Sequence, residues 1–245
     1  MVAAVLILYT TVAAKDLLVH SRKVYDCLVT EDITCARKAV SMIVGRDTED
    51  LDQAGIVRAS VETVAENMVD GITAPLFWGI VLSMFAPLGG FRAIELAAFG
   101  GMSYKAINTM DSMFGYKNEA YREFGWTAAR LDDIANFLPA RISAGFVILA
   151  AFALKLDGRQ AGKIFLRDRL RHSSPNSAHT ESAVAGALGV QLGGITSYFG
   201  VKTEKPTIGD RLRDMHADDI LLAGRLVQVG SLAFILFFLI LQGLY

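Results

Sequence analysis

The sequence predicts an all-α, polytopic helical integral membrane protein in which amphipathic and re-entrant helices carry the polar motifs. Hydrophobic residues make up 53% of the 245 residues and the mean hydropathy is +0.39, while charged residues still make up 20%. Alternating strand patterns are scarce. A long uncharged run closes the chain, and about 20 apolar residues are enough to cross a bilayer.

Four apolar runs are candidates for the membrane segments. The best span is Leu226 to Tyr245, which has 20 uncharged residues, and the second is 139–156, with Arg141 as its one charge before Lys155. Val2 to Ala14 is too short at 13 residues and lacks the features of a secretory signal. Ile72 to Phe99 is broken by Pro87–Gly90, which favours a re-entrant hairpin or a buried helix pair. A large soluble helical core is the alternative.

The remaining segments are also helical in pattern. Lys15 to Ser41 predicts a charged amphipathic helix or a helix pair, followed by a polar loop at 45–52. Helices are expected at about 54–70, 101–114 and 127–138, with Pro139 breaking or kinking the last, and a small-residue helix closes at Gly189. We expect turns from Gly193 to Gly209, and a single domain over residues 1–245.

Charge and cysteine usage exclude several classes of protein. The formal net charge of −1 gives no support for nucleic-acid binding. Cys27 and Cys35 lie eight residues apart on what we predict to be helix, so two ordinary thiols are expected. The phosphate-loop, paired-cysteine and HExxH motifs are absent. The basic stretch 163–172 follows the second predicted span, which predicts a cytoplasmic position for it.

The stretch RASVETVAENMVDGITAPLFW places one arginine and then three acids at helical spacing, and the three acids carry like charges. Arg58, Glu62, Glu66 and Asp70 follow one another at intervals of four residues, beside a regular apolar arc. Like charges at this spacing repel by a few tenths of a kcal/mol per pair, which a solvated face tolerates. The functional interpretation is a wall of an enclosed chamber that binds Mg²⁺ together with phosphates, since Mg²⁺ prefers oxygen ligands.

Three further polar clusters flank the apolar segments. The first is on 104–118, the second is on 130–136, where adjacent acids precede an amide, and the third is a loop that leads into a helix start. Polar residues beside apolar runs are costly unless they face a cavity, and helix N-termini bind anions. Arg130 could equally form a structural ion pair with Asp133, and His179 is weak evidence for a base.

These motifs, in this order, resemble the adenosylcobinamide-phosphate synthase family of cobalamin-biosynthesis membrane proteins. The resemblance is carried by VGRDTEDLD (44–52), IVRASVETVAENMVDGITAPLFW (56–78), the segment 104–141, and HSSPNS with ESAVAGALGVQLGG (172–194). It implies an ATP-dependent acid–amine ligase that joins adenosylcobyric acid to an aminopropanol phosphate or an analogue, giving adenosylcobinamide phosphate. Mg²⁺ and ATP are the implied cofactor and co-substrate. The chain is expected to lack the family's usual N-terminal segment.

The expected site gathers residues from all of these motifs. The catalytic candidates are Glu62, Glu66, Asp132 and Asp133, and the metal ligands are drawn from Asp47, Glu66, Asp70, Asp111 and Asp133. Substrate and phosphate binding are assigned to Arg46, Arg58, Asn67, Lys105, Asn108, Lys117, Asn118, Arg130, Asn136, Arg141, Ser174 and Asn176.

The resemblance also implies the setting of this site. We expect a multi-pass protein of the cell membrane with the site on the cytoplasmic side, and either a homo-oligomer or an association with other late cobalamin-pathway membrane enzymes. The alternative function is a membrane carrier or binding protein for a corrinoid or another anionic ligand. A carrier would more often interrupt its spans near the midplane of the bilayer.

Overall fold

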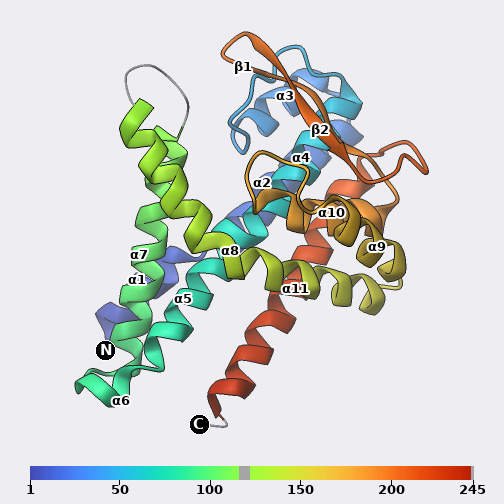
Figure 1. Ribbon diagram of the computed structural model, residues 1–245. Coiled ribbons are helices and arrows are strands. Elements are labelled where there is room, and N and C mark those ends of the chain that lie inside the picture. Colours follow the sequence, from blue (N-terminus) through green and yellow to red (C-terminus); the bar gives the residue numbers. More distant parts are fainter. Residues whose placement is uncertain (116–121, 244–245) are drawn as a thin grey trace.

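The computed structural model describes residues 1–115 and 122–243, and it confirms a helical protein. Figure 1 shows the arrangement of its elements. The helices are α1 (Val2–Thr11), α2 (Ala14–Val29), α3 (Ile33–Ser41), α4 (Gln53–Met68), the π-helix η1 (Val69–Thr73), α5 (Ala74–Ser83), α6 (Ala86–Gly89), α7 (Ala93–Phe114), α8 (Arg122–Ala153), α9 (Gly158–Asp168), α10 (Ser177–Leu188) and α11 (Asp218–Gly243). Strands β1 (Leu192–Tyr198) and β2 (Val201–Ile208) precede α11.

In the described part of the chain, three helical segments are long and apolar enough to cross a membrane. They are Val2–Val29, Gly125–Ala153 and Asp218–Gln242. The second and third overlap the two predicted spans, 139–156 and Leu226–Tyr245, over most of their length. The first was judged too short from residues 2–14 alone, but α2 follows α1 after only Val12 and Ala13, and together they reach the necessary length. The structure is therefore consistent with a polytopic membrane protein.

The molecule has an apolar end and a polar end. At the apolar end lie α1, α6 and the last turns of α11, as Figure 1 shows, and large side chains such as Leu88, Phe91, Phe99 and Ile240 are exposed there. Helices α5 and α7 form the predicted pair, and they approach so closely that a Cβ at Gly100 would lie 2.4 Å from the Trp78 carbonyl oxygen. Exposed apolar surface of this extent is typical of a lipid-facing region.

Helix α4 is the centre of the polar end. Asp52 accepts a hydrogen bond from the Gly55 N–H and so caps the first turn. The helix thus begins directly after the predicted polar loop 45–52. The helix packs against α2, α10 and α11, and most of its side chains are buried. Its C-terminus continues into the wider π-turn of η1, a feature that often occurs at functional sites.

Helix α8 runs through Pro139 instead of ending there. The helix spans Arg122–Ala153, and Figure 1 shows it changing direction near its middle. A proline inside a helix removes one hydrogen bond and bends the axis. The bend separates a first half, which carries Asp132, Asp133 and Asn136, from a second half whose buried alanines and Val147 pack in the main core.

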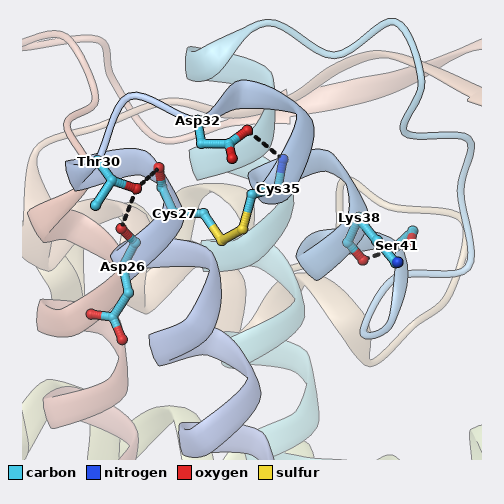
Figure 2. Close-up of a disulfide and its surroundings, with 7 residues drawn as sticks. All are labelled: Asp26, Cys27, Thr30, Asp32, Cys35, Lys38 and Ser41. Carbon is cyan, nitrogen blue, oxygen red and sulfur yellow. Dashed lines mark hydrogen bonds between the residues drawn. A yellow bond between two sulfur atoms is a disulfide. The ribbon is translucent and has the colours of Figure 1, made fainter.

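The expectation of two ordinary thiols was wrong, because Cys27 and Cys35 form a disulfide. On a single helix, residues eight apart would lie about 12 Å from each other. The chain instead reverses at Glu31, whose φ is 57°, and the two Cα atoms come within 5.6 Å. Figure 2 shows the bond joining the end of α2 to the start of α3, where Asp32 accepts a hydrogen bond from the Cys35 N–H.

The segment predicted as turns contains a two-stranded antiparallel hairpin. Strands β1 and β2 pair from Leu192 with Ile208 to Tyr198 with Val201, and Phe199 and Gly200 form the tight turn, both with positive φ. The strand signal was hidden because β1 has two glycines after Leu192 and β2 contains Pro206. The hairpin lies beside α10 and covers one side of α4.

Candidate functional site

The charged row of α4 does not form a single wall. At 3.6 residues per turn, each step of four residues advances about 40° around the helix. Glu66 and Asp70 consequently face a polar cavity, while Arg58 faces a different cavity and Glu62 lies under the hairpin. Of the four residues of the predicted wall, Glu66 and Asp70 line this polar cavity, whereas Glu62 and Arg58 do not.

The cavity beside Glu66 and Asp70 has a volume of about 460 Å³. Helices α4 and α7 and the loop after α3 form its sides, and we call it the acid-lined cavity. Its charged and amide side chains are those of Arg46, Glu66, Asn67, Asp70, Lys105, Asn108 and Asp111. All seven were predicted as site residues, and the structure brings them to one place.

A narrower pocket of about 40 Å³ shares Glu66 and Asp70 with the acid-lined cavity. It adds Asp132 and Asn136 from α8, Ser174 and Asn176 from the loop before α10, and Thr180. The pocket therefore brings residues of the second and third predicted clusters to Glu66 and Asp70 of the acid row. Sequence spacing could not show this, because the three motifs are separated by up to a hundred residues of chain.

A hydrogen-bond network connects the acids. Asn136 donates from Nδ2 to Asp70 Oδ1 at 3.1 Å and to Asp132 Oδ2 at 3.0 Å. Tyr104 donates to Asn136 Oδ1 at 2.9 Å and lies 3.3 Å from Asp70 Oδ1. Asn108 donates to Asp132 Oδ1 at 3.3 Å. Within this network of described residues the two acids are linked by neutral donors, so no ion pair there balances a negative charge on either acid.

The electrostatics of the cavity favour a bound cation. Burial, with the nearby charges of Asp132 and Glu66, raises the pKa of Asp70 to about 8. Burial and the charges of Asp133 and Glu66 also raise the pKa of Asp111. Lys105 Nζ donates to Asn108 Oδ1 at 3.3 Å, and the charge of Lys105 partly offsets the rise in the pKa of Asp70. An acid with a pKa near neutrality can accept a proton during a reaction.

Glu62 belongs to a separate, buried ion-pair cluster. Its carboxylate lies 2.6 Å from Arg46 Nη2 and accepts the Gly193 N–H at 2.7 Å. Burial alone would raise the pKa of Glu62, but Arg46 and Lys205 hold it below its usual range. With only 1% of its side chain exposed, Glu62 is positioned to stabilise the fold and not to touch a ligand. The catalytic role predicted for it is not supported by this position.

Glu181 and Lys205 extend this cluster and were missed in the sequence. Lys205 Nζ lies 3.2 Å from Glu181 Oε1, and His172 Nδ1 lies 3.6 Å from the same oxygen. Burial alone would lower the pKa of Lys205, but Glu181, Glu62 and Glu66 raise it. Glu181 is the first residue of the small-residue helix motif. A charged residue on a helix that is otherwise small and apolar was the signal in the sequence that could have revealed it.

Three further predicted residues, in addition to Glu62 and Arg58, also lie away from the acid-lined cavity. Asp47 accepts hydrogen bonds from Ser197 Oγ, Phe199 N and Gly200 N, so it anchors the hairpin turn and is not placed as a metal ligand. Asp133 accepts from Ser174 Oγ at 3.4 Å, which holds the loop before α10. Arg130 is exposed and its guanidinium carbon lies 5.7 Å from the centre of the Trp126 ring.

The other predicted residues have clear positions. Arg141 donates to the Phe137 carbonyl and to Asn176 Oδ1 at 3.2 Å, so it orients the loop that carries Ser174 and Asn176. Burial lowers the pKa of His179 to about 4, and its two buried ring nitrogens have no hydrogen-bond partner among the described residues, which gives no support for His179 as a base. Lys117 and Asn118 lie outside the described residues.

The described residues include no group of three or more His, Cys, Asp or Glu side chains arranged to hold a metal by themselves. Mg²⁺ in phosphate-transfer sites is commonly held by one or two carboxylates together with substrate phosphates and water. One or two carboxylates from Glu66, Asp70 and Asp132 fit that donor set, because all three line the same narrow pocket.

Comparison with known proteins gives a consistent result. The sequence matches the family described as CobD/Cbib protein over residues 1–227. Proteins named cobalamin biosynthesis protein CobD are similar to it: the one from Desulfotalea psychrophila is 56% identical over 99% of this chain and 75% of its own length. Those from Clostridium perfringens and Leptospira interrogans are 52% and 45% identical, over 88% and 98% of this chain and 64% and 72% of theirs. No solved structure matches.

Proposed function

Because the chain belongs to the CobD/Cbib family of cobalamin biosynthesis, we propose that it is the ATP-dependent ligase that joins adenosylcobyric acid to an aminopropanol phosphate or a close analogue. The product is adenosylcobinamide phosphate. The observation that carries the proposal is the network in which Asp70, Asp132 and Asn136 meet beside a cavity lined by Glu66 and Lys105.

The proposed reaction has two steps. The propionate oxygen of the corrinoid attacks the γ-phosphorus of ATP, which forms an acyl phosphate and releases ADP. The substrate amine then attacks the acyl carbon, the C–O bond to phosphate breaks, and inorganic phosphate leaves as the amide forms. The ammonium of the incoming substrate must lose a proton before this attack.

The residues of the acid-lined cavity supply what these steps require. Asp70, whose pKa is raised to about 8, is the candidate acceptor of the ammonium proton. Lys105 lines the same cavity and is the candidate cation for phosphate oxygens, whereas Arg46 is paired with Glu62. Mg²⁺ bound at Glu66, Asp70 or Asp132 would neutralise phosphate charge and lower the pKa of the acid that binds it. Only the propionate arm of the corrinoid would need to enter.

The position of the site relative to the membrane is also part of the proposal. The acid-lined cavity lies at the polar end, together with the basic stretch on α9, and basic segments favour the cytoplasmic side. The disulfide at the same end would then lie in a reducing compartment, where such bonds are readily reduced. Labelling of the cysteines by a membrane-impermeant thiol reagent, in intact and in permeabilised cells, determines the orientation.

The function is tested with the purified protein, ATP, Mg²⁺, adenosylcobyric acid and aminopropanol phosphate. We expect ADP and the amide product in equal amounts, measured by mass spectrometry. When the amine is left out, no amide should form and ADP should not exceed a single turnover. If the protein binds the corrinoid but produces neither ADP nor amide, the ligase proposal is wrong and a binding or carrier function is favoured.

A further inference from the structure

A second polar cavity lies at the start of α4, away from the acid-lined cavity. Its volume is about 430 Å³, and we call it the arginine cavity because three arginines line it. The residues are Ala54, Arg58, Gln191, Arg211, Arg213, Asp214 and Met215. None of these lines either of the two pockets around Glu66 and Asp70.

Arg58 is the feature that requires an explanation. Its Nε is buried and has no hydrogen-bond partner, and among the ion pairs of residues 1–115 and 122–243 none includes Arg58. A guanidinium is a fixed cation with five donors, and placing it partly out of water without an anion is costly. This cost is recovered when an anion binds to the guanidinium.

The other two arginines already have carboxylate partners. Arg213 is held by Asp219 and by the carbonyl oxygens of Leu188 and Asp214, so its guanidinium is fixed in place. Arg211 pairs with Asp214 at 2.6 Å, but both side chains are about 70% exposed, and such pairs are weak. Arg211 is thus free to turn toward a ligand, while Arg213 forms a rigid positive wall.

The backbone adds to the positive potential of this cavity. Ala54 lies in the first turn of α4, where the helix dipole and free N–H groups favour anions. Asp52 satisfies the N–H of Gly55, so the dipole contributes a potential here rather than a complete set of donors. Gln191, which immediately precedes β1, adds an amide that can donate.

We propose that the arginine cavity is a binding site for a phosphate group, with Arg58 as its principal cation. The group is carried either by a soluble phosphate compound or by the headgroup of an anionic lipid, since both present the same oxygens to a guanidinium. The site is distinct from the acid-lined cavity. It requires no metal and takes no part in the proposed ligation chemistry.

Binding is tested on the whole protein in nanodiscs of phosphatidylcholine, with EDTA present and inorganic phosphate as the probe. We expect saturable binding by calorimetry that Arg58→Gln weakens by about tenfold or more, the effect of losing a charge-assisted contact. Arg159→Gln, which removes an exposed arginine on α9, should bind as the wild type does. Arg211→Gln is a second test variant at an exposed position, and we expect a smaller loss of affinity.

Two further arms separate the sources and the sites. Nanodiscs that contain phosphatidylglycerol should reduce phosphate affinity if the lipid headgroup occupies the cavity, and leave it unchanged if the ligand is soluble. Asp70→Asn should retain phosphate binding even where it abolishes ligation. The proposal is overturned if the wild type shows no saturable binding, or if Arg58→Gln and Arg211→Gln both bind phosphate with wild-type affinity.

Discussion

Helix α4 carries two acids one turn apart whose surroundings are opposite. Glu62 is fully buried and is matched by Arg46 and by the Gly193 N–H. Glu66 lies on the wall of a cavity, and the acid after it, Asp70, is surrounded by Asn136, Tyr104 and the charge of Asp132. The comparison shows that an acid which stabilises the fold has its cation built in, whereas a site for a ligand leaves the charge open.

Asp70→Asn should have the largest effect on catalysis. The substitution keeps the shape of the side chain but removes both a proton acceptor and a candidate metal ligand, so we expect ligation to fall by about a thousandfold or more. Thermal stability should stay the same or rise, because the mutual repulsion with Asp132 and Glu66 is removed. Product formation and the unfolding temperature are measured on the same preparation. Activity within a few-fold of wild type would contradict the assignment.

Glu62→Gln should show the reverse pattern. The change leaves Arg46 buried, with 9% of its side chain exposed, and without its counter-charge, which typically costs about 3 to 5 kcal/mol. We expect a lower unfolding temperature, with the specific activity of the folded fraction largely retained. Glu66→Gln is the matched control one turn away, and it should lose activity and keep stability. The comparison breaks down if both variants lose the same property.

The sequence allowed the helical fold and most of the cavity residues to be predicted, because periodicity and polar clusters are local signals. It placed Glu66, Asp70, Asn108, Asp132 and Asn136 at one site, and the structure brings them together. Which charged side chains pair with each other could not be predicted in this way. Arg46 and Lys205 reach α4 and α10 through tertiary packing, which spacing along the chain does not encode.

The disulfide and the hairpin were missed for a related reason. Both depend on where the chain reverses: at Glu31 for the helix pair, and at Phe199 and Gly200 for the strands. Neither reversal has a strong signature, since Glu31 adopts a positive φ that its residue type rarely takes. The helix through Pro139 is the opposite case, in which tertiary packing outweighs a strong local signal.

Removal of the disulfide should moderately lower thermal stability, with the effect confined to the region of the Glu62–Arg46 ion pair. The bond closes a loop of about nine residues, for which loop entropy contributes about 2 to 3 kcal/mol to the free energy of unfolding. It also fixes the start of α3, and the loop after α3 carries Arg46. We expect the Cys27→Ser, Cys35→Ser double variant to unfold at a lower temperature and to keep its activity. The wild type treated with a reductant is the control and should behave as the double variant does. An unchanged unfolding temperature in both would contradict the prediction.

The smallest and most specific effect should be on the pH dependence of metal binding. A metal ligand must be deprotonated, and the pKa of Asp70 is raised to about 8. The affinity for Mn²⁺, which serves as a probe for Mg²⁺, should therefore rise by up to about tenfold per pH unit below pH 8 and level off above it. The stability of the metal-free protein should change in the opposite direction. The folded state holds a proton on Asp70 that the unfolded chain loses near its ordinary pKa, so the contribution of Asp70 to stability is present at low pH and is lost as the pH rises toward 8. Electron paramagnetic resonance of Mn²⁺ measures the affinity, and Asp70→Asn should remove the pH dependence while Glu62→Gln keeps it. An affinity that is flat from about pH 6 to about pH 9 would mean that the open charge of the acid-lined cavity does not hold the metal.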